Sequence, residues 1–464
     1  MYLYLAAALV FVLGIKRLTS VKTCRTGNRL SEVGMLLAVV TTLAIYGGLN
    51  WWIIVLGLAV GGAIGAWIAA RTPTTQMPEM VAALNGSGGF ASALVAMASL
   101  MISDVLKIEG HALVETGVVN AIATPATILI GMLTLTGSFV AFFKLSGKKM
   151  SHPLQGQQRH LLHVGLGVLA VVFGIWQVYS EGAVGLTTST ILLALVSGVL
   201  GVFLVMPIGG ADMPVVIALL NSYSGVAGAA AGFVISNPLL IVVGALVGTS
   251  GLILTRIMCK AMNRSLGNVL LGGIGDEAVA KDAKEYKSIK STTPEEVAML
   301  LDGASSVIMV PGYGLAVAQA QHILRELGDL LQRRGATVRY AIHPVAGRMP
   351  GHMNVLLAES DVPYEQLWEM DKINSDFKNT DVVIVVGAND VVNPAARTDP
   401  NSPIAGMPIL DVDYARTVVV IKRSLAPGYA GIRNPLFDMD NCLMVFLDAK
   451  EALEGIVAEV KQLK

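Results

Sequence analysis

A short glycine-containing turn in the C-terminal half of the sequence has the composition of a phosphate-binding loop. Residues 305–310 are β-branched and apolar, as in a buried strand, and the sequence GYG follows at 312–314. Residues 316–333 then have helical periodicity, and ATVRYAIHP predicts a second strand. In this order of elements the glycines let the backbone approach a pyrophosphate, and the helix N-terminus offers N–H donors. Val317 replaces a third glycine, so the alternative is an α/β fold with an empty turn.

Cations, and not acids, follow the strands where the ribose of a nucleotide would bind. Domains that bind NAD usually have Asp or Glu at the end of the second strand, where it holds the ribose 2′-hydroxyl. Here the second strand ends at IHP without an acid, Arg348 follows it, and Lys422 and Arg423 follow a later strand. Because cations suit a 2′-phosphate, the pattern favours NADP over NAD. The alternative is that these residues are surface cations.

The other elements of this half complete a doubly wound α/β domain of the Rossmann-like class. A helix begins after Thr293, since Pro294 suits its first position and Glu296 completes a capping box. We therefore place the α/β domain at residues 291–464. Three further strands and a final helix are predicted at 381–386, 417–421, 442–447 and 450–461.

The N-terminal half has the composition of a membrane domain. The whole chain is 54% hydrophobic and 14% charged, whereas soluble proteins have about 25% charged residues. The long apolar runs all lie in residues 1–258, and residues 259–290 form a linker. A helix that crosses the lipid bilayer needs about 20 mostly apolar residues. About nine transmembrane helices are predicted, at 1–15, 33–47, 51–70, 80–102, 118–143, 161–178, 187–206, 213–235 and 238–257.

Basic residues are distributed unequally between the two ends of these spans. Lysine and arginine gather in the loops on the cytoplasmic side of a membrane. The alternation of basic and neutral loops predicts a multi-pass chain with its N-terminus outside and its C-terminal domain in the cytosol. One side has only Lys107, and the other has Lys16, Arg17, Lys22, Arg25, Arg29, Arg71, Lys144, Lys148, Lys149, Arg159, Lys260 and Arg264.

A few polar residues lie inside the spans. Asn85 lies in the fourth span, Asn221 and Ser222 lie in the eighth, and Asp212 opens the eighth. A polar group at this depth must face a polar partner or water. The residues therefore predict a hydrated proton path, with hydrogen bonding between helices as the alternative. No lysine, arginine or histidine lies deep in a predicted span.

The charge and the cysteines argue against two classes of ligand. The formal net charge is +0, so nothing points to nucleic acid. Cys24, Cys259 and Cys442 have no metal-ligand spacing, so the sequence predicts no metal site.

Long motifs in both halves resemble one family. PGYGLAVAQAQ, HPVAGRMPGHMNVLLAE, GANDVVNPAA, SPIAGMP, KRSLAPGYAG, DMPVVIALLNSYSG and IMCKAMNRS are similar to the β subunit of proton-translocating nicotinamide nucleotide transhydrogenases. The resemblance implies hydride transfer between NADH and NADP⁺ while protons cross inward. It implies that this subunit binds NADP(H) and that an α subunit of one or two chains binds NAD(H). It also implies a homodimer of the αβ unit in the bacterial inner membrane.

The resemblance also assigns roles to residues. Lys422 and Arg423 would hold the 2′-phosphate, and Asp390 would link NADP(H) binding to the proton. The segment through Tyr429 would form a lid, and Asn221 and Asp212 match membrane positions implicated in proton transfer. Hydride transfer itself needs no protein acid or base, because the cofactors carry the chemistry. The residues implied to bind NADP(H) are Gly312, Tyr313, Gly314, Ala316, Val317, Arg348, Ala388, Asn389, Asp390, Lys422, Arg423, Gly428 and Tyr429.

One position departs from the family pattern. Well-known members have a histidine in the fourth span of this subunit, where this sequence has Asn85 in ALNGSGG. Some members place the proton-handling histidine on a helix of the partner subunit, and the departure points to that arrangement.

Two other functions are alternatives to this one. A channel or transporter with a nucleotide-sensing domain would need paired broken helices or repeated filter loops, and the sequence has neither. A structural membrane anchor for a dehydrogenase would not need polar residues inside its spans.

Overall fold

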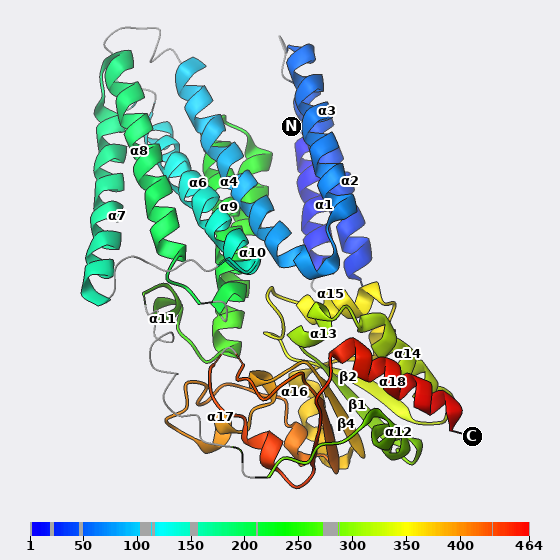
Figure 1. Ribbon diagram of the computed structural model, residues 1–464. Helices are drawn as coiled ribbons and strands as arrows, with labels where there is room; N and C mark the ends of the chain where they lie inside the picture. Colours follow the sequence, from blue (N-terminus) through cyan, green and yellow to red (C-terminus); the bar gives the residue numbers. More distant parts are fainter. Residues whose placement is uncertain are drawn as a thin grey trace. The chain divides into compact units, whose positions relative to one another are not determined.

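The computed structural model describes residues 2–18, 23–45, 50–102, 113, 117–148, 156–209, 212–271, 286, 288–428 and 430–463 (Figure 1). The chain divides into two compact units. The first comprises Met1–Pro207 and Val216–Leu254, and the second comprises Ile208–Val215 and Thr255–Lys464. Each unit has a hydrophobic core of its own.

The first unit is built from long apolar helices, and every predicted span falls on one of them. Eight of the helices are long and apolar enough to cross a membrane, and α1, with 17 residues, is slightly shorter. The chain is therefore a multi-pass helical membrane protein. The helices are α1 (Tyr2–Leu18), α2 (Cys24–Ile45), α3 (Trp51–Arg71), α4 (Met77–Ile102), α6 (Val118–Leu145), α7 (Gly156–Tyr179), α8 (Gly182–Val205), α9 (Met213–Val234) and α10 (Pro238–Ala261).

Small residues let the central helices of this unit touch through their backbones. A Cβ atom added to Gly131 of α6 would lie 2.5 Å from the carbonyl oxygen of Gly89 in α4. A Cβ added to Gly225 of α9 would lie 2.4 Å from the amide nitrogen of Gly248 in α10. No side chain fits at such distances, so α4 packs directly on α6 and α9 on α10. Among the candidate membrane spans of the described residues, α9 is the most enclosed, because 61% of its 18-residue apolar stretch is buried.

The second unit contains a parallel sheet of six strands in the order β3-β2-β1-β4-β5-β6. The predicted doubly wound α/β domain is confirmed. The strand order reverses between β1 and β4, and this is where α/β sheets of this type open a crevice at the carboxyl ends of their strands. The strands are β1 (Ser306–Pro311), β2 (Thr337–Ile342), β3 (Leu367–Glu369), β4 (Val382–Val386), β5 (Thr417–Ile421) and β6 (Cys442–Val445).

The helices that begin and end this domain form as the sequence predicts. Helix α12 (Pro294–Asp302) has the expected capping box, in which Thr293 Oγ1 accepts the Glu296 N–H at 3.4 Å. Helix α18 (Ala449–Gln462) is the predicted final helix and packs on α12.

One prediction for this domain is wrong, and one strand was not predicted. The expected single helix at 316–333 is two helices, α13 (Tyr313–Val317) and α14 (Gln321–Arg333). Between them Gln319 has φ +52°, a left-handed conformation that ends a helix and that is usually signalled in a sequence by glycine or asparagine. Strand β3 was not predicted, because its three residues are only partly buried and form no apolar run.

Candidate functional site

A cavity of about 560 Å³ opens at the point where the strand order reverses. The volume lies within the range of about 300–1,000 Å³ typical of small-molecule sites. Five segments of the second unit, each after the carboxyl end of a strand, line it together with Met262; residues 447–449 after β6 are one of the five, and the other four surround the reversal of strand order. These four are the glycine turn after β1, the segment 345–348 after β2, the segment 387–391 after β4 and the segment 422–428 after β5.

The glycines of the first turn are needed where two turns cross. A Cβ added to Gly312 would lie 2.4 Å from the carbonyl oxygen of Gly387, and one added to Gly314 would lie 2.6 Å from Gly387 Cα. Gly387 itself has φ +65°, which favours glycine. The turns after β1 and β4 are thus pressed together, and the GAND segment lies beside GYG. Of the two residues predicted to follow in the turn, Ala316 is buried and Val317 is 48% exposed beside the cavity.

The predicted cations all line the cavity. Lys422 and Arg423 lie just beyond β5, and Arg348 lies beyond β2 with its guanidinium carbon 4.4 Å from the ring centre of Tyr313. Lys422 Nζ donates to the carbonyl oxygen of Ser424 at 3.0 Å. Burial lowers the pKa of Lys422, and the negative charge of Asp390 opposes this shift.

Gly428 and Ala430 pack closely over Asp390, which is 2% exposed. A Cβ added to Gly428 would lie 2.2 Å from Asp390 Oδ2, and the Ala430 N–H donates to the same oxygen at 3.1 Å. The predicted lid residue Tyr429 lies outside the described residues. Gly428 also lines the cavity. This residue therefore both covers Asp390 and forms part of the cavity wall.

Asn389 has a side-chain donor that meets no acceptor among the described residues. Its Nδ2 is buried without a hydrogen-bond partner, although the residue lines the cavity. The rest of Asn389 is held by Asn434, whose Nδ2 donates to the Asn389 carbonyl oxygen at 3.1 Å and to Oδ1 at 3.0 Å. Buried donors are normally satisfied, so a ligand oxygen here would supply the missing acceptor. Together with the cations, this donor fits a ligand with phosphate and amide oxygens.

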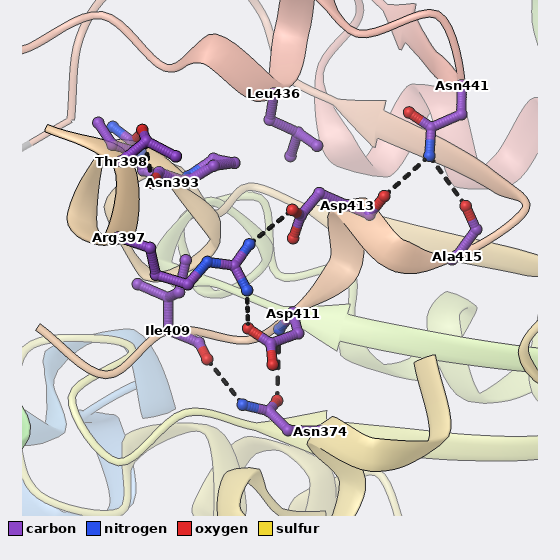
Figure 2. A network of polar contacts seen from close by, with 12 residues as sticks. Asn374, Asn393, Arg397, Thr398, Ile409, Asp411, Asp413, Ala415, Leu436 and Asn441 are labelled. Carbon is purple, nitrogen blue, oxygen red and sulfur yellow. Dashed lines mark hydrogen bonds and ion pairs between the residues drawn. The ribbon is translucent and has the colours of Figure 1, made fainter. Parts of the chain in front are cut away.

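The long loop between β4 and β5, which carries Asn389 and Asp390, is braced on its far side (Figure 2). Arg397 pairs with Asp411 and, at 2.5 Å, with Asp413. Asn374 Nδ2 donates to the carbonyl oxygen of Ile409 at 2.9 Å, and Asn441 Nδ2 donates to that of Ala415 at 2.8 Å. Side chains from three regions of the chain therefore hold the far side of this loop.

Known proteins match the chain over nearly its full length. The family model described as NAD(P) transhydrogenase beta subunit matches residues 1–459. The chain belongs to the NAD(P) transhydrogenase β-subunit family. Two proteins of Rhodospirillum rubrum, one from strain ATCC 11170, are each named NAD(P) transhydrogenase subunit beta. Each is 48% identical to this chain over 457 residues, which cover 98% of this chain and 97% of the relative.

Membership confirms the resemblance seen in the motifs and identifies the chain as a subunit of a transhydrogenase. The name of the family implies an α subunit as partner and the use of nicotinamide nucleotides. It does not favour the channel or transporter considered as an alternative.

In this β subunit two of the predicted proton-path residues come from helices that face each other. Asn85 in α4 is 7% exposed, and its Nδ2 donates to the carbonyl oxygen of Ile217 in α9 at 3.4 Å. A Cβ added to Gly88, one turn further along α4, would lie 2.6 Å from Ser224 Oγ. Asn221 is half-buried and lies between Ile217 and Ser224 on the same face of α9. The structure therefore brings Asn85 and Asn221 to one helix interface.

The other two predicted proton-path residues have partners of their own. Ser222 is fully buried, and its Oγ donates to the carbonyl oxygen of Gly248 at 2.6 Å. This contact holds α9 to α10. Asp212, in the second unit, forms an ion pair with Arg264 in which Oδ2 and NH1 are 2.7 Å apart. Neither contact brings these residues to the interface of α4 and α9.

One histidine of the membrane unit is buried, although the sequence predicts no histidine deep in a span. His163 lies in α7, is 7% exposed, and places Nε2 3.0 Å from the carbonyl oxygen of Phe203 in α8. The residue is near the start of the predicted span, where a histidine normally reaches the aqueous interface. Only the packing of α7 on α8 shows that it points inward.

A further histidine, His343, is buried in the second unit. His343 follows β2, where Nε2 donates to the carbonyl oxygen of Pro408 at 2.8 Å and Nδ1 accepts the Val345 N–H at 3.2 Å. Burial lowers the pKa of His343 to about 4, although the bond to Pro408 and the charge of Asp371 oppose the shift. The fold therefore favours the neutral ring, which makes both hydrogen bonds.

We expect the stability gained from neutral His343 to be complete above pH 6.5 and to be lost as the pH falls from 6.5 toward 4. The loss is up to about 1.4 kcal/mol per pH unit for such a group. Thermal unfolding of the detergent-solubilised chain at a series of pH values measures it. His343→Gln keeps a donor for Pro408 and should flatten the acid side of the profile. The exposed His322→Gln serves as control, and a profile for His343→Gln identical to the wild type would contradict the assignment.

Proposed function

We propose that this chain binds NADP(H) in the cavity at the reversal of strand order. We further propose that, with an NAD(H)-binding α subunit, it couples hydride transfer between NADH and NADP⁺ to inward proton translocation. The observation that carries the proposal is the cationic lining of the cavity, where Lys422, Arg423 and Arg348 replace the ribose-binding acid of NAD sites.

The parts of the cavity have distinct roles in this proposal. Lys422 and Arg423 hold the 2′-phosphate, because charge-assisted hydrogen bonds to phosphate are strong and directional. The crossed glycine turns leave room for the pyrophosphate, and the Nδ2 donor of Asn389 takes a ligand oxygen. Bound NADP(H) supplies or accepts the hydride. The residues of this chain orient the nucleotide, and the segment over Asp390 excludes water from it.

In the membrane, we place Asn85 and Asn221 on the path that protons follow. Neutral amides do not titrate, but they can hold a water molecule and orient a donor on a neighbouring helix. The titrating group at this level then comes from the partner subunit, in keeping with Asn85 at the position of the family's histidine. In this proposal the chain lies in the bacterial inner membrane with the α/β domain in the cytosol, and the αβ unit forms a homodimer.

The assignment of Lys422 predicts a selective loss of affinity. Lys422→Ala should weaken NADP⁺ binding by about 1.5–3 kcal/mol, the range for a hydrogen bond to a charged group. It should leave the weak binding of NAD⁺, which lacks the 2′-phosphate, nearly unchanged. Titration calorimetry of the detergent-solubilised chain measures both, with Lys372→Ala, a lysine exposed outside the cavity, as control. If both nucleotides lose affinity equally, Lys422 supports the fold and does not anchor the phosphate.

A further inference from the structure

Helix α8 ends just before a proline, which removes the backbone donor that one of its carbonyl groups would use. In an α-helix the carbonyl oxygen of Phe203 accepts the N–H of residue 207, but residue 207 is proline and has no N–H. Met206, which caps α8, has the helical values φ −57° and ψ −38°. The nitrogen of Pro207 therefore occupies the place of a helical donor without being one.

The side chain of His163 in α7 serves the same carbonyl group. Its Nε2 lies 3.0 Å from the carbonyl oxygen of Phe203. Because a carbonyl oxygen only accepts, the ring must carry a proton on Nε2. His163 is 7% exposed, so this bond is made away from bulk water, where a carbonyl group that loses its donor is costly. His163 thus supplies the hydrogen bond that Pro207 removes.

A lysine of α6 holds the next part of the same helix end. Lys144 Nζ donates to the carbonyl oxygen of Met206 at 2.5 Å. A cation is favoured here, because the C-terminus of a helix carries a partial negative charge. The contact of Lys144 is an added cap, whereas that of His163 replaces a bond of the helix itself. Side chains of α6 and α7 together therefore fix the point where α8 ends.

The end of α8 and the polar part of α9 pack on one glycine of α6. A Cβ added to Gly137 would lie 3.1 Å from Cγ2 of Val205, the last residue of α8, and 3.3 Å from Leu220 Cδ2 in α9. Val205 and Leu220 are each 2% exposed, and Leu220 directly precedes Asn221. A displacement of the end of α8 therefore reaches the part of α9 that faces Asn85.

We propose that His163 is a positioning residue, which replaces the N–H missing at Pro207 and so holds the end of α8 against α9. This inference rests on the proposed function, since that function places Asn221 on the proton path. With the bond made, Val205 stays packed beside Leu220, and Asn221 keeps its place opposite Asn85. Without the bond the last turn of α8 frays, and Asn221 loses the alignment in which the two amides can hold water.

A second-site replacement tests the exchange of donors directly. Pro207→Ala restores an N–H, which the helical conformation of Met206 directs at the Phe203 carbonyl group. The assay is proton-driven NADPH formation in vesicles that contain the complete αβ complex. His163→Leu should lower the rate about tenfold, the effect of leaving one buried carbonyl group without its donor. The double variant His163→Leu, Pro207→Ala should recover to within about twofold of the wild type, because a backbone bond replaces the lost one. A double variant as slow as His163→Leu would overturn the inference.

Two conservative replacements show whether the position of the donor matters. The amide nitrogen of glutamine reaches about as far as Nε2 of histidine, whereas that of asparagine does not. His163→Gln should therefore keep most of the rate, and His163→Asn should be as slow as His163→Leu. All these variants should bind NADP⁺ with wild-type affinity, since the residues that line the nucleotide cavity belong to the second unit. Should His163→Leu fail to assemble, equal rates for His163→Gln and His163→Asn would overturn the inference.

Gln177→Leu is the matched control for general damage to the same helix pair. Gln177 lies in α7, is fully buried, and donates from Nε2 to Thr190 Oγ1 of α8 at 2.6 Å. It thus joins α7 to α8 as His163 does, but at the other end of α7 and without a proline in its partner's helical bond. Its replacement should leave the rate of NADPH formation unchanged. Losses of equal size in Gln177→Leu and His163→Leu would mean that both report only the packing of α7 on α8, and the positioning role would be wrong.

Thermal unfolding of the same proteins separates this inference from the proposed function. His163→Leu should lower the melting temperature clearly when residue 207 is proline and much less when it is alanine, because the two sites then share one acceptor. If the melting temperatures follow this pattern while every variant forms NADPH at the wild-type rate, His163 only stabilises the helix end and the positioning role is refuted. If the wild-type complex itself forms no NADPH in response to the gradient, the proposed function is wrong, and the melting temperatures alone decide the exchange of donors.

Discussion

The purified chain, supplied with NADH and NADP⁺, should form no NADPH. Hydride transfer requires two nucleotides face to face, whereas the sequence has one glycine-rich nucleotide turn, at 312–314. The cavity built on that turn has cations where an NAD site has an acid. We therefore expect NADH to find no site of its own on this chain. Addition of the NAD(H)-binding α subunit should change the rate from background to full turnover.

Chromatographic measurement of NADPH distinguishes the product from NADH. The same preparation is assayed before and after the α subunit is added, so that turnover after addition proves the chain intact. Lys422→Ala in the completed complex should need a higher NADP⁺ concentration for half-maximal rate. Rapid NADPH formation by the chain alone would refute the two-subunit account.

Replacement of Asn221 should abolish proton coupling without loss of nucleotide binding. Asn221 lies on the face of α9 that packs against Asn85 and Gly88 of α4, inside the most enclosed span of the membrane unit. Leucine there removes a group that can hold water and orient a proton donor. If the amide only joined helices, its removal would cost about 0.6 kcal/mol on average, which is too little to stop the complex.

The experiment measures proton uptake and hydride transfer together in vesicles that contain the complete complex. For Asn221→Leu both should fall to background, while NADP⁺ still binds with wild-type affinity. Ser87→Leu is the control, because Ser87 is exposed on α4 and bonds only to the carbonyl oxygen of Ala83 in its own helix. Proton uptake by Asn221→Leu at the wild-type rate would mean that the residue serves helix packing.

Much of the fold could be predicted because it follows from local patterns. Apolar runs predicted all nine long helices, and β-branched runs predicted five of the six strands. The features that the sequence did not predict depend on contacts between distant segments. The break at Gln319 has no glycine or asparagine to signal it. Strand β3 exists because β2 offers it a pairing edge, and its own residues carry no strand pattern.

The residues of the candidate site also fall into those that the sequence predicts and those that only the structure shows. Lys422, Arg423 and Arg348 could be predicted, since each follows a strand whose end must lie at the crevice. Asn434 could not, because its role arises from hydrogen bonds to Asn389 that no spacing in the sequence reveals. His163 was missed for a related reason, since its burial depends on how α7 meets α8.

The preference of this chain for NADP⁺ over NAD⁺ tests the account most directly. Titration calorimetry of the full-length chain in detergent, without the α subunit, gives both dissociation constants. Two charge-assisted hydrogen bonds from Lys422 and Arg423 to the 2′-phosphate, each contributing about 1.5–3 kcal/mol, predict that NADP⁺ binds at least about 100-fold more tightly than NAD⁺. Equal affinities for the two nucleotides would contradict the account.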